Sequence, residues 1–230
     1  MNANRREKKH NATLDEIRAT AWKQIGEIGA ASLSLRAIAR EMKVTAPALY
    51  RYYKDRDALV TALLIDAFTA FSAALEAGRD TCSADDHPGR FRAMAKSYFT
   101  WARQNPQRYA LLFGTSIPGY LFAEELRPVA QRSFLILQGV IGEAQAAGKI
   151  TGEFATLRLP TPLKSNYEAL RKMGMPCTPQ VTQLALSTWG IMHGITSLYL
   201  HHYLSGFLQE SVEAFVDFEI EKMVRALGLV

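Results

Sequence analysis

The sequence of 230 residues predicts an all-α fold in two parts, with about nine helices in total. Three observations lead to this prediction. Apolar residues recur at steps of three and four along most of the chain, the period of a helix with one buried face. Ser, Thr and Asp precede several of these stretches, and Gly or Pro follows them. Positive charge gathers at one end: residues 1–56 hold 12 Lys and Arg against 6 Asp and Glu, whereas the rest hold 15 against 16.

The first part is expected to contain three helices. The first is predicted over 13–28, with a capping box in Thr13–Glu16 and a stop at Gly29. Its buried stripe is expected to comprise Leu14, Ile17, Ala21, Ile25 and Ile28. The second is predicted over 34–43 with Ser34 as its N-cap. After a short turn, Thr45 is expected to cap the third helix, whose Leu49 and Tyr53 point inward and whose Pro47 lies in the first turn.

Two short helices joined by a tight turn are typical of a helix-turn-helix, whose last helix enters the major groove of DNA. The outward face of the third helix combines small residues, which allow close approach, with aromatic and basic side chains able to reach bases or phosphates. These residues are Ala46, Ala48, Tyr50, Arg51 and Tyr52. The alternative is an ordinary three-helix core that binds no DNA. Two outward tyrosines argue against it.

Residues 13–65 resemble the DNA-binding domain of TetR/AcrR transcriptional regulators. The resemblance rests on Ser34-Leu-Arg-Ala-Ile-Ala-Arg, Val44-Thr-Ala-Pro-Ala-Leu-Tyr-Arg-Tyr-Tyr and Lys54-Asp-Arg-Asp-Ala-Leu. It implies phosphate contacts by Arg36 and by Arg56, which stands where the family usually has lysine. The recognition residues that it implies are Thr45, Ala46, Ala48, Tyr50, Arg51 and Tyr52. Because alanine offers no side-chain hydrogen bond, base reading is expected to rest on Thr45, Arg51 and Tyr52, while Tyr50 is expected to contact a phosphate.

Residues 1–12 are expected to form a basic, flexible tail in front of a DNA-binding domain at 13–57. Arg5, Arg6, Lys8 and Lys9 supply its charge. Such a tail either enters the minor groove as an arm or is disordered and binds nonspecifically. A polar stretch follows the tail where a signal peptide would have an apolar one, and we find no run of about 18 apolar residues. The protein is therefore expected in the cytoplasm, on the nucleoid, without a membrane partner.

The second part, residues 58–230, is expected to be larger, helical and rich in aromatic side chains. A long helix from Asp55 to about Arg79 links it to the first part. Further helices are predicted over 90–104, 128–148, 181–204 and 210–227. The connector Thr151–Pro179 contains four prolines, so it is either mobile or a lid, with at most a short helix near 164–173.

Three segments of the second part resemble the C-terminal regulatory domain of one TetR subgroup. They are Phe113-Gly-Thr-Ser-Ile-Pro-Gly-Tyr120, Trp189-Gly-Ile-Met-His-Gly194 and Ala226-Leu-Gly-Leu229. The resemblance implies a homodimer in which the last two helices of each subunit form a four-helix interface. Gly190 and Gly194 leave room for close helix approach. Periodicity does not decide whether the apolar stripe of the last helix is buried in a dimer or within one subunit; the stripe comprises Val212, Phe215, Val216, Ile220, Met223 and Leu227.

An apolar, aromatic-rich site for a small-molecule effector is expected in this second part. The candidate residues are Trp101, Phe113, Tyr120, Phe122, Trp189, Met192 and His193. His193 is either a ligand-sensing imidazole or a hydrogen-bonded packing residue. Taken singly, a residue of this kind is more often part of the core than a ligand contact, so the prediction rests on the set.

No catalytic, metal or cofactor site is expected. The sequence has no Gly-rich phosphate loop, no Gly-x-Ser-x-Gly elbow and no His-Glu-x-x-His, and Glu7 to His10 is a Glu-x-x-His spacing within the basic tail. Cys82 and Cys177 are far apart and form no Cys-x-x-Cys. The sequence thus predicts a homodimeric repressor that leaves a pseudo-palindromic operator when a small apolar effector binds. The alternative is a nonspecific nucleoid-type DNA-binding protein, which explains the charge but not the aromatic second part.

Overall fold

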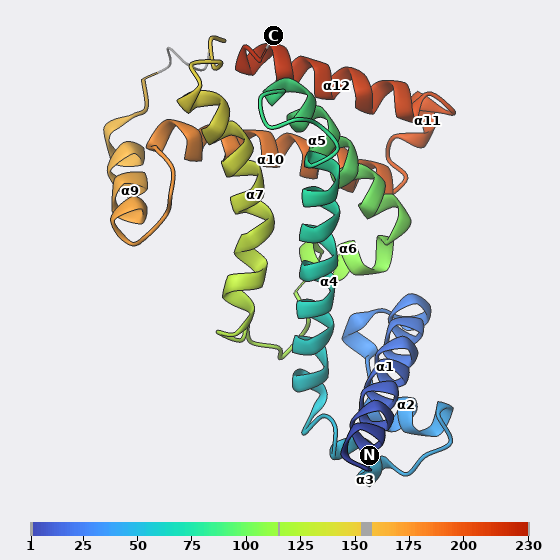
Figure 1. Ribbon diagram of the computed structural model, residues 1–230. Helices are drawn as coiled ribbons and strands as arrows, with labels where there is room; N and C mark the ends of the chain where they lie inside the picture. The colour runs from blue at the N-terminus through green and yellow to red at the C-terminus, as the bar shows by residue number, and fades with distance from the viewer. Residues whose placement is uncertain (1, 115, 153–157, 230) are drawn as a thin grey trace. The chain divides into compact units, whose positions relative to one another are not determined.

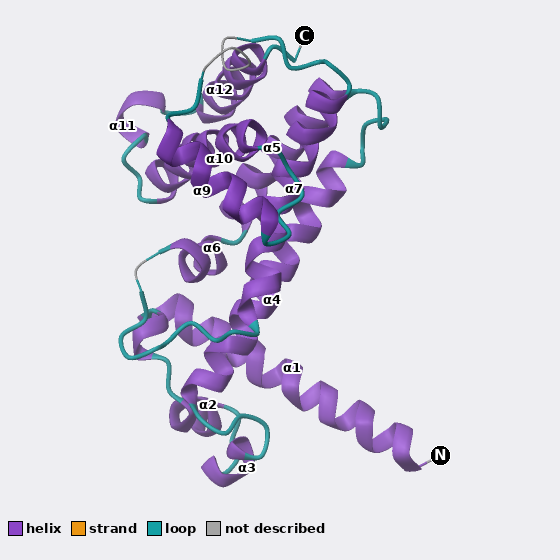
Figure 2. Ribbon diagram, turned by 90° about the vertical axis from the view of Figure 1, so that its left-hand side faces the viewer, coloured by secondary structure: helices purple, strands orange, loops and turns teal. Residues whose placement is uncertain are grey.

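The computed structural model describes residues 2–114, 116–152 and 158–229, and this part of the chain is helical without strands (Figures 1 and 2). It contains eleven α-helices and one short 3-10 helix. The chain divides into two compact units, Met1–Phe68 with Pro106–Arg127, and Thr69–Asn105 with Pro128–Val230. The long helix α4 (Arg56–Arg79) contributes residues to both units. The predicted all-α class is confirmed.

The first unit packs three N-terminal helices with the start of α4 and with α6. Its elements are α1 (Asn2–Ile28), η1 (Ala30–Ser32), α2 (Leu35–Glu41), α3 (Ala46–Tyr50) and α6 (Pro106–Phe113). Ile17, Ile38 and Leu49 are almost fully buried and form the centre of its core. α6 covers α1, where the Arg108 guanidinium lies 5.0 Å from the centre of the Trp22 ring. A cation over an aromatic face adds electrostatic attraction to this packing.

The start of α1 corrects one prediction. The helix begins at Asn2 and includes most of the residues expected to form a tail. Thr13 is inside the helix and its Oγ1 donates to the carbonyl oxygen of Lys9 at 3.0 Å, so the predicted capping box is wrong. The physical reason is that residues 2–12 contain neither Gly nor Pro, so nothing interrupts the backbone hydrogen bonds. Ile28, expected on the buried stripe, is 55% exposed at the end of the helix.

Side-chain N-caps begin two helices of the first unit as the sequence predicts. Ser34 is the N-cap of α2, and its Oγ accepts from the backbone N–H of Ala37 at 3.4 Å. The Asp55 carboxylate accepts from the N–H of Ala58 at 2.7 Å and caps α4. Thr45 occupies the N-cap position of α3 without a side-chain capping bond. α3 has only five residues, because the chain turns after Tyr50.

The second unit is built around α5, which packs against both α10 and α12 (Figure 1). Besides the end of α4, its helices are α5 (His87–Gln104), α7 (Leu126–Ala146, from Pro128), α9 (Thr161–Lys172), α10 (Pro179–Leu200), α11 (Ser205–Leu208) and α12 (Val212–Leu227). The buried ring of Phe71 lies 5.0 Å from that of Tyr98 and 4.9 Å from that of Trp101. Within the connector predicted to be mobile or a lid, residues 153–157 lie outside the described residues, and α9 occupies much of the rest.

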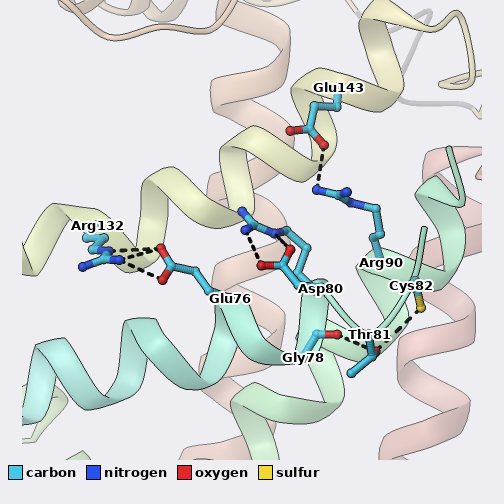
Figure 3. Close-up of polar contacts among 9 residues, drawn as sticks. Glu76, Gly78, Asp80, Thr81, Cys82, Arg90, Arg132 and Glu143 are labelled. Carbon is cyan, nitrogen blue, oxygen red and sulfur yellow. Dashed lines mark hydrogen bonds and ion pairs between the residues drawn. The ribbon is translucent and has the colours of Figure 1, made fainter. Parts of the chain in front are cut away.

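Ion pairs at the surface of the second unit join α7 to α4 and to α5. Arg132 on α7 makes a bidentate pair with Glu76 on α4 at 2.8–2.9 Å, and Arg90 on α5 pairs with Glu143 on α7 at 3.1 Å (Figure 3).

Among the described helices, α4 alone is long and apolar enough to cross a membrane, with a mean hydropathy of 1.9 over an 18-residue window. Since 56% of that window is buried inside the protein, core packing accounts for the composition.

Four of the six residues in the apolar stripe of α12 are buried within the chain, and Val212 and Phe215 are half-buried. Val216, Ile220, Met223 and Leu227 are each at most 6% exposed, on the helix that packs against α5. Beside this stripe, α5 and α12 are joined by ion pairs between Arg92 and Glu221, Lys96 and Glu213, Lys96 and Asp217, and Arg103 and Glu213. The last helix therefore uses this stripe for its own subunit's core.

These ion pairs predict how stability depends on acid. The hydrogen bond from Lys96 lowers the pKa of Glu213, and that from Arg92 lowers the pKa of Glu221, from the ordinary value of 4.5. A pKa depressed in the folded state means stabilisation that is complete above about 4.5 and is lost as pH falls through the folded value. We expect the free energy of unfolding, measured with urea, to decrease as the pH is lowered beyond about 4.5. Because the carboxylates are partly exposed, each pair contributes less than about 1 kcal/mol.

The double variant E213Q/E221Q serves as the comparison. It should be less stable than the parent at neutral pH and should lose less of its stability on acidification. An unchanged acid dependence in this variant would show that other carboxylates govern it.

Candidate nucleic-acid interface

The outward face of α3 is open while its inward face is buried. Leu49 is 2% and Tyr53 6% exposed, as predicted, whereas Tyr50 is 45% exposed and Arg51 is also exposed. Among the other predicted recognition residues, Thr45 and Arg36 are exposed, and Ala46 and Ala48 are half-buried. Exposed basic and aromatic side chains on a helix with small neighbours fit the major groove and its phosphates.

Tyr53 locks the end of this segment onto α1 and α4. Its phenolic oxygen accepts from Arg18 Nε at 3.1 Å, and the same nitrogen lies 3.3 Å from the Asp66 carboxylate. Burial raises the pKa of Asp66, and the charges of Arg18 and Arg108 oppose this effect. Tyr53 is thus a packing residue that orients the outward side chains next to it.

Tyr52 is placed differently from the exposed side chain expected of a base-reading residue. It is half-buried, and its ring stacks on His10 of α1 with centroids 5.0 Å apart and an interplanar angle of 22°. A stacked aromatic pair adds about 0.5–1.5 kcal/mol beyond its buried area. The contact joins the start of α1 to the residues that follow α3. No local sequence signal connects these two positions.

Arg56, implied as a phosphate ligand, is engaged with backbone carbonyls. Its Nη2 donates to the oxygens of Ala30 and Ala31 at 3.1 and 2.9 Å, and its Nη1 donates to that of Pro118 at 3.4 Å. The planar guanidinium has donors on separate nitrogens, so it can bind all three carbonyl oxygens at once. A lysine has a single ammonium group and could not reproduce this arrangement. Arg56 therefore ties η1 and the loop after α6 to the start of α4.

The predicted effector residues Phe113, Tyr120 and Phe122 belong to the first unit. The Phe113 ring lies 5.0 Å from that of Tyr109 and 6.2 Å from that of Phe68. The Tyr120 hydroxyl lies 2.8 Å from that of Thr61 on α4, and Phe122 is 56% exposed. Thr115, within the same motif, lies outside the described residues. Tyr120 thus helps to hold the loop on α4.

The other four predicted effector residues lie in the second unit. Trp101 is buried against Phe71, and Trp189 is 36% exposed. His193 Nε2 lies 3.4 Å from Ser197 Oγ, and burial lowers the pKa of this imidazole, which favours its neutral form. Met192 is buried and lines a cavity.

This cavity lies between α5, α10 and α12 and measures about 20 Å³. Its lining is mostly apolar and comprises Ala95, Tyr98, Phe99, Met192, Ile195, Thr196, Val216, Glu219, Ile220 and Met223. Met192 is the one predicted effector residue in this lining. A volume of this size holds about one water molecule, so a larger ligand requires the flexible Met192 and Met223 to move. The sequence did not single out the lining residues on α5 and α12, because cavity-lining residues and ordinary core residues follow the same apolar pattern along a helix.

Comparison with known proteins identifies both parts of the chain. Residues 17–63 match the family model described as bacterial regulatory proteins, tetR family, and residues 91–223 match that described as tetracyclin repressor-like, C-terminal domain. The HTH-type transcriptional regulator Rv1816 of Mycobacterium tuberculosis is 36% identical over 183 residues, covering 76% of this chain and 75% of that protein. A protein of the same class from Mycobacterium bovis, Mb1846, has the same identity and coverage.

Solved structures show the same architecture. The regulatory protein SCO4313 is 28% identical, with a TM-score of 0.78, over 95% of this chain and 98% of that one. A protein from Rhodococcus sp. RHA1 is 26% identical, with a TM-score of 0.72, over 94% and 95%. The open face of α3, the matches to both domains and these relatives lead to one conclusion: the chain belongs to the TetR family of DNA-binding transcriptional regulators.

Proposed function

We propose that this protein is a homodimeric repressor that binds a pseudo-palindromic operator and leaves it when a small apolar effector binds. One observation carries the proposal. Thr45, Tyr50 and Arg51 are exposed on one side of a segment whose other side, Leu49 and Tyr53, is locked into the core. A rigid support holds reading side chains in the geometry that base recognition needs. DNA binding is assigned to residues 13–57, and effector binding and dimerisation to 58–230.

Exposed apolar side chains on α10 support the dimer. Ile191 and Leu198 are each 45% exposed, and they lie two helical turns apart on the same face. Gly190 and Gly194 are beside them, and a Cβ atom built on either glycine would meet nothing within 4 Å. This face is therefore apolar and allows a second helix to approach closely. In a symmetric dimer, two α3 helices would enter successive major grooves of one operator.

The cavity between α5, α10 and α12 supports an effector of apolar character. A ligand shifts DNA affinity only by the difference in its own affinity for the two conformers of the protein. An effector that requires the cavity to widen would favour a conformer in which the two recognition helices are wrongly spaced. The protein would act on the nucleoid in the cytoplasm.

Footprinting on the DNA upstream of the protein's own gene, followed by a screen of small apolar molecules for release, tests the proposal. A protected pseudo-palindrome of two half-sites about one helical turn apart is expected. Equal binding to any duplex, with strong salt dependence, would instead support the nonspecific nucleoid-type protein. Activation of transcription from a promoter with this site would contradict the repressor role.

Arg51→Ala tests whether α3 reads sequence. Because Arg51 is exposed on the outward face, the variant should fold normally and lose about 1–3 kcal/mol of operator binding if it contacts a base. Fluorescence anisotropy with operator and with mixed-sequence duplexes measures this loss. Arg171→Ala, which removes an exposed charge from α9, is the matched control. Equal losses on the two duplexes would reassign Arg51 to the DNA backbone.

A further inference from the structure

The first three turns of α1 extend the DNA-binding unit in a way that the function above does not use. α1 runs without interruption to Asn2, and Figure 2 shows it as one continuous helix towards the N-terminus. Residues 5–10 are exposed, and they hold four basic side chains against one acidic side chain, Glu7. Because the backbone is helical, each of these basic side chains leaves the helix in a fixed direction, which a flexible tail would not provide.

The stack between His10 and Tyr52 determines which side of this extension faces the recognition segment. Tyr52 comes directly after Tyr50 and Arg51, the exposed side chains at the end of α3. In a helix-turn-helix, the first residues of the recognition helix contact the bases, so the chain that leaves the helix at Tyr52 lies towards the groove edge and the phosphates. The His10 side of α1 is therefore the side next to the expected path of the DNA backbone.

Helical spacing divides the basic residues into two pairs. Arg6 lies one turn before His10 on the same face, and Lys9 lies on the same flank as Arg6. Arg5 and Lys8 point away from the His10 side, and Glu7 lies on its other flank. At the rise of an α-helix, Arg6 lies about 6 Å and Lys9 about 1.5 Å beyond His10 along the helix axis. Both basic residues are therefore held next to the His10–Tyr52 stack in a fixed direction.

We propose that the start of α1 is a helical clamp on the DNA backbone. Arg6 and Lys9 bind phosphates at the edge of the groove that α3 enters, and His10 is a positioning residue that holds the clamp against Tyr52. The clamp adds affinity without sequence preference, because phosphates carry no base information. This inference rests on DNA binding through α3 but not on repression or on an effector.

Two double variants of equal charge test it. R6A/K9A should weaken binding to a mixed-sequence 24-base-pair duplex about 10- to 100-fold and flatten the salt dependence by about three to four units of slope in a dimer. R5A/K8A removes the same charge from the opposite side and should change affinity by less than about threefold. Equal losses in the two variants would overturn the clamp in favour of a nonspecific tail, and no loss in either would remove the segment from the interface.

Further variants separate a helical clamp from a flexible arm. Ala12→Pro leaves every charge in place but interrupts the helix, so it should weaken binding as R6A/K9A does. Wild-type affinity in this variant would establish an arm and sink the proposal. His10→Ala should weaken binding, and His10→Phe, which retains a ring for the stack, should restore it. Thermal melts followed by circular dichroism verify that each variant folds; loss of binding in His10→Phe would also count against the positioning role.

The duplexes separate this inference from the function proposed above. If the wild type fails to distinguish operator from mixed-sequence DNA, the specific-repressor proposal fails. The two double variants still report on the clamp, because phosphate contacts are measurable on any duplex.

Discussion

Leu49→Ala is expected to unfold the first unit at moderate temperature and to abolish operator binding. Leu49 is 2% exposed and is among the largest fully buried side chains, so its truncation leaves a cavity in a small core. Leu-to-Ala changes at such sites cost about 3–5 kcal/mol. That is a large share of the about 5–15 kcal/mol that stabilises a typical domain. Because α3 has only five residues, Leu49 supplies much of its buried contact, together with Tyr53 just after its end.

Chemical denaturation followed by circular dichroism measures the loss, and anisotropy measures operator binding. Ile28→Ala is the matched control, since Ile28 is 55% exposed and its truncation should change the free energy of unfolding by less than about 0.5 kcal/mol. Helical signal from the second unit should persist in Leu49→Ala. A variant with parental stability and operator affinity would show that α3 does not depend on this core.

Ile191→Glu is expected to prevent the proposed dimer and thereby weaken operator binding by about 100-fold or more. Burying a carboxylate in an apolar helix contact without a partner is strongly unfavourable. A monomer presents one α3 helix and loses the gain in affinity that two linked sites provide, which is about 10²- to 10⁴-fold. Since Ile191 is 45% exposed in one subunit, the fold of the subunit should survive.

Sedimentation velocity gives the oligomeric state, and footprinting gives the length of the protected site. Leu121→Glu makes the same chemical change at a residue that is 85% exposed, in the loop after α6, and should remain dimeric. If Ile191→Glu stays dimeric with a full footprint, the α10 face is not the dimer contact.

Local features of the first unit could be predicted from the sequence because neighbours along the chain produce them. Ser34 and Asp55 cap helices that start one residue away, and Leu49 and Tyr53 share a face because they are four residues apart. Thr13 shows where such reasoning fails. The same hydroxyl that can cap a helix also fits inside one, and the residues before it did not contain a breaker.

Contacts between distant residues could not be predicted in this way. The Arg56 guanidinium donates to carbonyls 25, 26 and 62 residues away, and Arg92 pairs with Glu221, which is 129 residues away. The stack of His10 on Tyr52 likewise joins two segments without any pattern common to both. The seven expected effector residues are aromatic or apolar in sequence, yet they occupy several environments, and only Met192 lines the cavity between α5, α10 and α12.

The sequence by itself determined the all-α class, the helix-turn-helix and the family, because periodicity, caps and motif spacing are properties of short segments. Only the tertiary structure decided that the stripe of α12 is buried against α5, that α10 presents an exposed apolar face, and that α1 reaches Tyr52. The physical reason is that an apolar face or a charged group specifies the kind of partner it needs. Which partner it meets depends on how the whole chain packs.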